Sequence, residues 1–279
     1  MLVTTLEGSL EGRSEGTQLQ KIPILLYHSI SEEASPEFKL YTVTPAMFER
    51  QLAYLSGQHY SPLTVTELVT ALRTGGSTLP EKPVIITFDD GFQDFYTAAL
   101  PALTRYGFTA TLYVTTGLIE KTSKWLASEG EGTRRMLNWS QLYEIDASGI
   151  ELGGHTLNHP QLDLLPASMA RNEIELCKKT LEHKLGYPVL SFAYPHGYHT
   201  STIKRMVREA GFTSACAVKF AMSSVNDDPF ALSRLLVTND TDEEAFEALL
   251  SSQNSTVKMA AKKALAPAWR MWRRYKTQA

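Results

Sequence analysis

Seven short apolar runs, rich in β-branched residues, alternate along the chain with segments of helical periodicity, and this alternation constrains the fold most. The runs have strand length, and several are apolar nearly throughout, as expected of strands buried on both faces. They span residues 22–28, 84–88, 109–114, 150–155, 190–194, 213–218 and 232–238. Between most of them, helices are predicted over residues 45–56, 94–106, 140–147, 166–185 and 201–210. Strands that alternate with helices predict an α/β fold with a parallel sheet, closed into a barrel.

The 279 residues divide into three stretches of different composition. Residues 1–20 are polar and lack the basic start and apolar core of a secretory signal, so we interpret them as a disordered leader. Residues 21–252 contain all the predicted strands and form one domain. Residues 253–279 are basic and amphipathic, with seven basic residues and no acidic residue between Lys258 and Lys276. We predict that this segment either lies on an anionic membrane surface or packs its aromatic residues on the barrel.

Charge and hydropathy exclude several classes of partner. The net charge of −3 gives no reason to expect nucleic acid. No apolar run reaches the length of a transmembrane helix. The predicted location is therefore the cytoplasm or the membrane periphery, unless a misassigned start codon hides a secretory signal.

Two adjacent carboxylates follow the second apolar run. Asp89 and Asp90 stand directly after the strand predicted over residues 84–88. In an α/β barrel, the carboxyl ends of the strands carry the active site. Neighbouring carboxylates repel each other unless a cation or a proton separates them. A metal ion on one aspartate and a role as base for the other would resolve the conflict, and a helix cap is the alternative.

Two histidines follow the fourth run. His155 and His159 are four residues apart, a spacing that on a helical turn lets both bind one ion. With Asp90 they would form a set of two histidines and one carboxylate. No Cys-x-x-Cys pair exists, so a metal ion here must take nitrogen or oxygen ligands. Zn²⁺, Fe²⁺, Co²⁺ and Ni²⁺ all suit this donor set.

A third segment, Tyr194-Pro195-His196-Gly197, lies at the end of the fifth run. Proline and glycine there indicate a tight turn, which can aim a backbone N–H group at a developing oxyanion. An ordinary loop is the alternative.

These segments resemble the motifs of a known family. TFDDG (87–91) and HTLNH (155–159) match the first two motifs of the polysaccharide deacetylases of carbohydrate esterase family 4, the NodB-homology domain. FAYPHG (192–197) is similar to the third motif, although Ala193 stands where many members have arginine. Leu26-Tyr27-His28 ends the first predicted strand, which is similar to the circularly permuted branch of poly-N-acetylglucosamine deacetylases. The resemblance covers residues 21–252 and implies a distorted (β/α)7 barrel.

The resemblance implies a metal ion and a base. Asp90, His155 and His159 would hold one divalent ion, with Zn²⁺ expected ahead of Co²⁺, Ni²⁺ or Fe²⁺. Asp89 would be the catalytic base. Because the usual arginine partner of that base is missing, we take Arg234 as its candidate substitute, with a surface or structural ion pair as the alternative.

The resemblance also implies an acid and a substrate pocket. His28 would protonate the leaving amine, unless it is a core histidine, and Leu26 would line a small acetyl pocket. The backbone N–H of His196 would stabilise the oxyanion, and Pro195 would contact the substrate from the same loop. Three aromatic residues are candidates for stacking on sugar rings, namely Trp125, Trp139 and Tyr194, although core packing is the favoured alternative for Trp139.

Together these features predict a metal-dependent hydrolase that removes N-acetyl groups from acetamido sugars of a polysaccharide or glycan precursor. The expected partner is an N-acetylated glycan. Three alternatives stay open: an O-acetyl esterase, an amidohydrolase acting on a small amide, and a glycan-binding barrel without catalysis. The intact aspartate and histidine set argues against the last of these.

Overall fold

The computed structural model describes residues 21–218, 221–224 and 226–251. The predicted leader, 1–20, and the basic segment, 253–279, lie outside the described residues, so their interpretations stay predictions. Within the described part of the chain, no helix combines the length and the hydrophobicity that a bilayer span requires.

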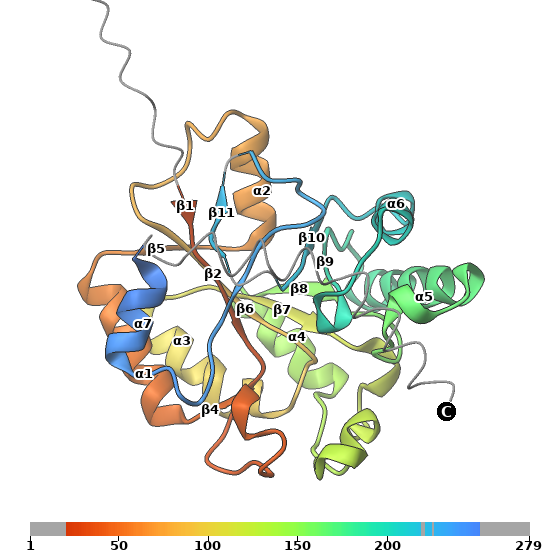
Figure 1. The fold of residues 1–279 in the computed structure, drawn as a ribbon, viewed down its shortest axis with the longest axis horizontal. Helices are drawn as coiled ribbons and strands as arrows, with labels where there is room; N and C mark the ends of the chain where they lie inside the picture. The colour runs from red at the N-terminus through yellow and green to blue at the C-terminus, as the bar shows by residue number, and fades with distance from the viewer. Residues whose placement is uncertain (1–20, 219–220, 225, 252–279) are drawn as a thin grey trace, which may run out of the picture.

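One curled sheet of eight parallel strands, seven of them in a single row, forms the centre of the described residues, with helices packed around it (Figure 1). In spatial order these seven are β10 (Ser214–Cys216), β9 (Ser191–Ala193), β8 (Glu151–Gly154), β7 (Thr111–Val114), β6 (Pro83–Phe88), β2 (Ile24–Tyr27) and β12 (Leu235–Leu236). Each pairing in this order is parallel, and β5 (Ser61–Leu63) pairs with the start of β6. The predicted α/β architecture is confirmed.

The two edges of the sheet meet, which gives it the form of a distorted barrel. Leu232, just before β12, forms an isolated parallel bridge with Cys216 of β10. The N–H of Leu232 donates to the carbonyl of Ala215 at 3.0 Å, and the N–H of Ala217 donates back to Leu232 at 2.9 Å. The segment that leads into β12 therefore contacts β10, while β12 itself pairs with β2.

The five predicted helical segments are present. They are α1 (Pro45–Gly57), α3 (Leu100–Tyr106) with a preceding π-helical turn (Phe95–Ala99), α4 (Trp139–Ala147), α5 (Ala167–Leu185) and α6 (Ser201–Glu209). Two further helices, α2 (Val65–Arg73) and α7 (Glu243–Leu250), were not predicted. Figure 1 shows α1, α3 and α7 on one flank of the sheet and α5 and α6 on the opposite flank.

Short elements shape the loops around the sheet. Two small pairings are β1 (Lys21–Ile22) with β11 (Ser223–Ser224), antiparallel, and β3 (Ser29–Ile30) with β4 (Thr42–Val43), parallel. Short 3₁₀ turns span Lys39–Tyr41, Thr116–Leu118, Lys124–Glu129, Leu162–Leu164 and Pro195–Gly197.

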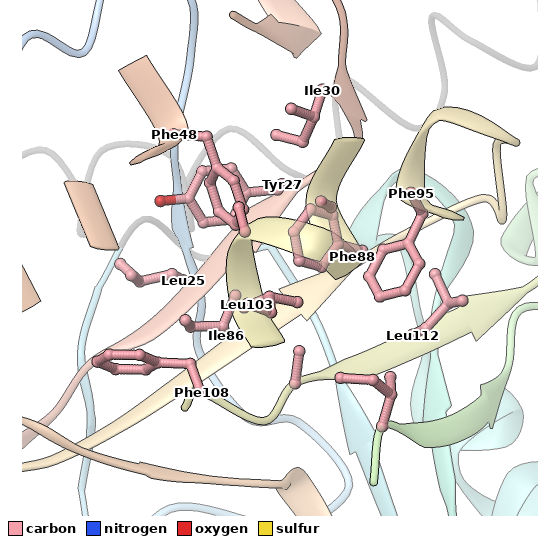
Figure 2. Packing of buried hydrophobic residues seen from close by; sticks show 14 of the residues in the cluster. Leu25, Tyr27, Ile30, Phe48, Ile86, Phe88, Phe95, Leu103, Phe108 and Leu112 are labelled. Atoms are coloured by element: carbon pink, nitrogen blue, oxygen red, sulfur yellow. The ribbon is translucent and has the colours of Figure 1, made fainter. Parts of the chain in front are cut away.

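Side chains alternate between the two faces of the sheet, because successive residues of a strand point to opposite sides. On the outer face of β2 and β6, Phe88 packs 5.3 Å from Tyr27 and 4.8 Å from Phe95, measured between ring centroids (Figure 2). On the inner face, Ile24 and Ile85 belong to a separate buried cluster. Continuing along the inner face of β6, Thr87 and then Asp89 follow Ile85, so the interior changes from apolar to polar toward the carboxyl ends of the strands.

Candidate metal and catalytic site

The aspartate pair stands at the carboxyl end of β6, where the backbone turns sharply. Asp90 and Gly91 both have left-handed backbone conformations, with φ of 76° and 85°. The N–H of Gly91 donates to the carbonyl of Asp89 at 3.0 Å, and that of Thr115 to Asp90 at 3.3 Å. A left-handed conformation is uncommon for a residue other than glycine and persists where surrounding contacts enforce it. The turn leaves both carboxylates near the same imidazole, since Oδ2 of Asp89 lies 3.9 Å and Oδ1 of Asp90 3.4 Å from Nε2 of His155.

Asp90, His155 and His159 come together as a buried set whose ligand atoms all lie within 4.8 Å of one another. Oδ1 of Asp90 is 3.1 Å from Nε2 of His159 and 3.4 Å from Nε2 of His155. The same buried oxygen has no hydrogen-bond partner. A buried carboxylate oxygen facing two imidazole nitrogens fits the donor set of a divalent transition metal. The residues present can therefore hold the ion that the sequence predicts.

The histidine segment is a loop and not a helical turn, which corrects one expectation. Thr156 and His159 have left-handed backbones, with φ of 68° and 61°. The N–H of His159 donates to Oγ1 of Thr156 at 3.0 Å. The loop thus turns back on itself and brings both imidazoles to one side without helical geometry.

Glu173 of α5, which the sequence analysis missed, holds this loop from outside. Its carboxylate accepts the N–H groups of Leu157 at 3.0 Å and Asn158 at 2.8 Å, and also the side-chain amide of Asn158 at 2.8 Å. Three bonds from one carboxylate fix the residues between the two histidines. No sequence pattern distinguishes this glutamate from others on the same helix.

The imidazole of His155 is oriented by the backbone of β9. Its Nδ1 lies 2.8 Å from the carbonyl oxygen of Ala193 and therefore donates to it, which leaves Nε2 as the ligand atom. Burial alone would lower the pKa of His155, but the carboxylates of Asp89 and Asp90 outweigh it and raise the pKa. Burial would likewise raise the pKa of Asp90, and the neighbouring imidazoles hold it well below the ordinary value instead.

Arg234 pairs with Asp89 through two parallel bonds. Nη1 donates to Oδ1 at 2.6 Å and Nη2 to Oδ2 at 2.7 Å. Arg234 is fully buried, so the alternative of a surface ion pair is wrong. Further bonds run from Nη1 to Oγ1 of Thr87 at 3.2 Å and from Nε to the carbonyl of Ala217 at 3.2 Å. Burial would raise the pKa of Asp89, but Arg234 together with the imidazoles of His155 and His28 outweighs burial and lowers the pKa below its ordinary value.

His28 follows β2, and its ring is half-buried beside the ring of Tyr41, 5.1 Å away between centroids. Burial lowers the pKa of His28, and the charges of Asp90 and Asp89 partly oppose that shift. The N–H of Asp89 donates to the carbonyl of Tyr27, the residue before His28, at 3.0 Å. Nδ1 of His28 is buried without a hydrogen-bond partner. Leu26, on the same face of β2, is fully buried beside Thr87 in the sheet register. Its acetyl-pocket role stays a prediction.

The turn after β9 brings His196 to the metal set. His196 is exposed, its backbone is left-handed with φ of 58°, and its ring lies 4.8 Å from that of His159. Pro195 is buried at the start of the turn, and its substrate contact stays a prediction. Tyr194 is 0% exposed and donates its hydroxyl to the carbonyl of Phe230 at 2.9 Å. Because the Tyr194 ring has no accessible face, the prediction that it stacks on a sugar is wrong.

The two tryptophan candidates differ in position. Trp139 is half-buried between two hydrophobic clusters, with the ammonium of Lys184 5.3 Å above its ring, which is the packing alternative. A sugar-binding role for Trp139 is therefore not supported. Trp125 is half-buried with its ring centroid 5.1 Å from that of His159. Trp125 is thus beside the metal set.

A buried Asp-His-His set beside a second carboxylate that pairs with a buried arginine is the arrangement expected of a metal-dependent hydrolase. The chain belongs to the polysaccharide deacetylase family, because the family model described as Polysaccharide deacetylase matches residues 76–215, half of the sequence. The predicted family and its general activity, the deacetylation of a polysaccharide, are confirmed.

Individual relatives span most of this chain. YxkH of Bacillus subtilis (strain 168) is 28% identical over 232 residues, which cover 83% of this chain and 77% of that protein. The poly-beta-1,6-N-acetyl-D-glucosamine N-deacetylase of Staphylococcus aureus (strain MRSA252) is 25% identical over 226 residues, covering 78% and 73%. Among solved structures, the Streptococcus pyogenes deacetylase PplD in complex with acetate is 27% identical, with a TM-score of 0.72, and the match covers 84% of this chain and 99% of that one.

Proposed function

We propose that this protein hydrolyses the acetamide groups of N-acetylated amino sugars in a polysaccharide of the poly-N-acetylglucosamine type. The observation that carries the proposal is the different pairing of the two aspartates. Oδ1 of Asp90 faces the imidazoles of His155 and His159, while both carboxylate oxygens of Asp89 accept bonds from Arg234, and Oδ2 of Asp89 lies 3.9 Å from Nε2 of His155. Amide hydrolysis needs both a ligand set and a base. The printed substrate of the Staphylococcus aureus relative supports the choice of glycan.

Asp89 is the base in this proposal. A divalent ion bound by Asp90, His155 and His159 would act as a Lewis acid toward the acetyl carbonyl and lower the pKa of water. Asp89 accepts the proton that the attacking water loses as its oxygen bonds to the acetyl carbon. Arg234 keeps Asp89 ionised for this purpose. The N–H of His196 is the candidate donor to the oxyanion.

His28 is the acid. Cleavage of the C–N bond releases acetate and an amine, and the amine must gain a proton as it leaves. The position of His28 at the end of β2, within range of the charges of Asp89 and Asp90, supports this role. Trp125 and Tyr41, whose rings lie beside those of His159 and His28, offer half-exposed faces for the adjoining sugars.

One observation favours the O-acetyl esterase alternative. His28 has a lowered pKa and a buried Nδ1 without a partner, which together disfavour its charged form in the metal-free protein. An ester depends less on protonation of its leaving group than an amide does. The same set of ligands and base would then act on O-acetyl groups.

Acetate release from matched N-acetylated and O-acetylated oligosaccharides, with and without a chelator, tests the proposal. We expect chelator-sensitive release from the N-acetylated β-1,6-linked glucosamine oligomer. Faster release from the O-acetylated oligomer would favour the esterase, and no release from either after metal reconstitution would favour a binding protein. Asp89→Asn is the control for release that does not depend on the site.

We also propose that residues 253–279 bring the enzyme to an anionic membrane surface, since that segment combines seven basic residues with recurring aromatic ones. Sedimentation of the full chain with anionic vesicles, and its absence for a chain ending at Ser251, is the expected result. Equal sedimentation of both chains would contradict the proposal.

A further inference from the structure

The backbone around Arg134 is tied to the segment that carries the two aspartates. The N–H of Leu137 donates to the carbonyl of Gly91 at 3.0 Å, and that of Gln93 to the carbonyl of Arg135 at 2.9 Å. An antiparallel bridge also joins Met136 to Phe92. Since residues 91–93 directly follow Asp90, the chain immediately after Arg134 is anchored to the segment that carries the metal ligand and the base.

The side chain of Arg134 contacts the segment that follows His28, the proposed acid. Nη1 donates to Oγ of Ser29 at 3.0 Å and to Oδ2 of Asp94 at 2.9 Å. Asp94 in turn accepts the hydroxyl of Ser29 at 2.7 Å and the N–H of Ile30 at 3.3 Å. Nη2 of Arg134 donates to the carbonyl of Glu33 at 3.0 Å. One guanidinium therefore holds the segment that begins immediately after His28.

The bonds from Arg134 and Asp94 join the two segments beyond the point where the pairing of β2 with β6 ends. The ladder between β2 and β6 ends with the pair Tyr27–Phe88, followed by a bond from the N–H of Asp89 to the carbonyl of Tyr27 at 3.0 Å. His28 lies one residue beyond that bond. From Ser29 onward, Asp94 and Arg134 bond to the residues directly after His28, and bonds from Ser35 to Glu129 and Glu131 hold the same segment further along.

The Arg134 guanidinium is also packed between aromatic rings that lead back to His28. It lies 5.3 Å from the ring centroid of Phe38 and 5.6 Å from that of Phe92. Phe38 contacts Tyr41 at 5.7 Å, and Tyr41 contacts His28 at 5.1 Å, both between ring centroids. The side chain of Arg134 is only 12% exposed and that of Asp94 15%, so this pair is screened far less than a surface ion pair.

We propose that Arg134, acting with Asp94 and Ser29, is a positioning residue that sets His28 at the correct distance from the Asp89–Asp90 pair. The inference rests on the proposed role of His28 as the acid. Displacing a catalytic group by about 1 Å can cost about 100-fold in rate. The loss of rate should be larger for amide substrates than for activated esters, because His28 contributes most where the leaving group needs a proton.

Two variants test this proposal with a matched control. Arg134→Met removes the guanidinium but keeps an unbranched side chain between Phe38 and Phe92. Ser29→Ala removes only the hydroxyl and leaves the ion pair between Arg134 and Asp94 in place. Arg171→Met is the control, since Arg171 forms a comparable ion pair with Glu209 at 2.9 Å but is 40% exposed between α5 and α6. Each variant is assayed for kcat/KM on an N-acetylated β-1,6-linked glucosamine oligomer and on 4-nitrophenyl acetate, together with metal content and Tm.

We expect Arg134→Met to lower kcat/KM on the acetamido oligomer by about 10- to 100-fold, with metal content retained and a much smaller loss on the aryl acetate. Ser29→Ala should also lower kcat/KM more on the acetamido oligomer than on the aryl acetate, but by a smaller factor. If Arg134→Met does not fold, the result for Ser29→Ala tests the proposal. Equal losses on both substrates would overturn the proposal, because a lower folded fraction reduces both rates alike. Selective loss in His28→Ala but not in the Arg134 and Ser29 variants would overturn this inference alone. Equal loss on both substrates in His28→Ala would overturn the acid role itself.

Discussion

Replacing Arg234 with methionine should lower both stability and catalytic rate, because it leaves the buried carboxylate of Asp89 without its paired positive charge. Two bonds of 2.6 and 2.7 Å join this guanidinium to Asp89, and the side chains are 0% and 4% exposed. Removing one partner of a buried pair leaves the other charge uncompensated, which costs about 3–5 kcal/mol. We therefore expect the free energy of unfolding of Arg234→Met at pH 7 to fall by about that amount, measured by denaturant unfolding.

The same change should move the pH dependence of activity. Burial raises the pKa of Asp89, and in the native protein Arg234, His155 and His28 together outweigh that effect. Without the guanidinium, the strongest opposing charge is lost and the pKa of Asp89 rises relative to the native protein. The acidic limb of the profile of kcat/KM against pH should therefore shift to higher pH, measured by acetate release at saturating metal.

The double variant Asp89→Asn/Arg234→Met separates charge from packing. It carries no uncompensated buried carboxylate, so it should be more stable than Arg234→Met alone. If Arg234→Met unfolds at the wild-type denaturant concentration and keeps the wild-type pH profile, the ion pair has neither the structural nor the electrostatic role argued above.

Three further predictions concern the metal set. Asp90→Asn, His155→Gln and His159→Gln should each lose bound metal by elemental analysis, and wild-type metal content in the histidine variants would contradict the ligand assignment. Glu173→Ala should weaken metal affinity by about 10- to 100-fold in a chelator competition, because the loop loses its anchor, while Glu175→Ala on the same helix should not. In the metal-free protein the pKa of His155 is raised above its ordinary value of 6.5. Protonated His155 therefore contributes its full stabilisation at pH values below 6.5, and this contribution is lost as the pH rises through the pKa of the folded state. The difference in unfolding free energy between wild type and His155→Gln should therefore shrink on going from pH 6 to pH 9, and a constant difference would refute the raised pKa.

The sheet could be predicted because its strands are buried on both faces and so appear as apolar runs. The run over residues 84–88, for example, becomes β6 (Pro83–Phe88). Helix α2 was missed although its start carries a signal: Thr64 and Glu67 form a reciprocal capping box, the pattern that marks a helix N-terminus. Val65, Leu68, Val69 and Leu72 also follow the helical spacing, so both signals were present in the sequence and were overlooked.

At the site, the ligand types followed from sequence, but their geometry did not. The helical interpretation of residues 155–159 was wrong because Thr156 and His159 have left-handed backbones, which residue type does not reveal. Tyr194 was misassigned because position 193 points into the barrel and position 194 points outward against Phe192 and the α5–α6 side. The connection from Arg134 to Ser29 spans 105 residues and follows no local pattern.

Metal content and acetate release measured in parallel for Asp89→Asn and His159→Gln test the central claim most directly. If the two aspartates divide the work as argued, Asp89→Asn retains its metal and loses about 10²- to 10⁴-fold in turnover of the acetamido oligomer. His159→Gln should lose metal and activity together. An Asp89→Asn protein that has lost its metal, or one that keeps its metal and wild-type turnover, would contradict the assignment of Asp89 as base and Asp90 as ligand.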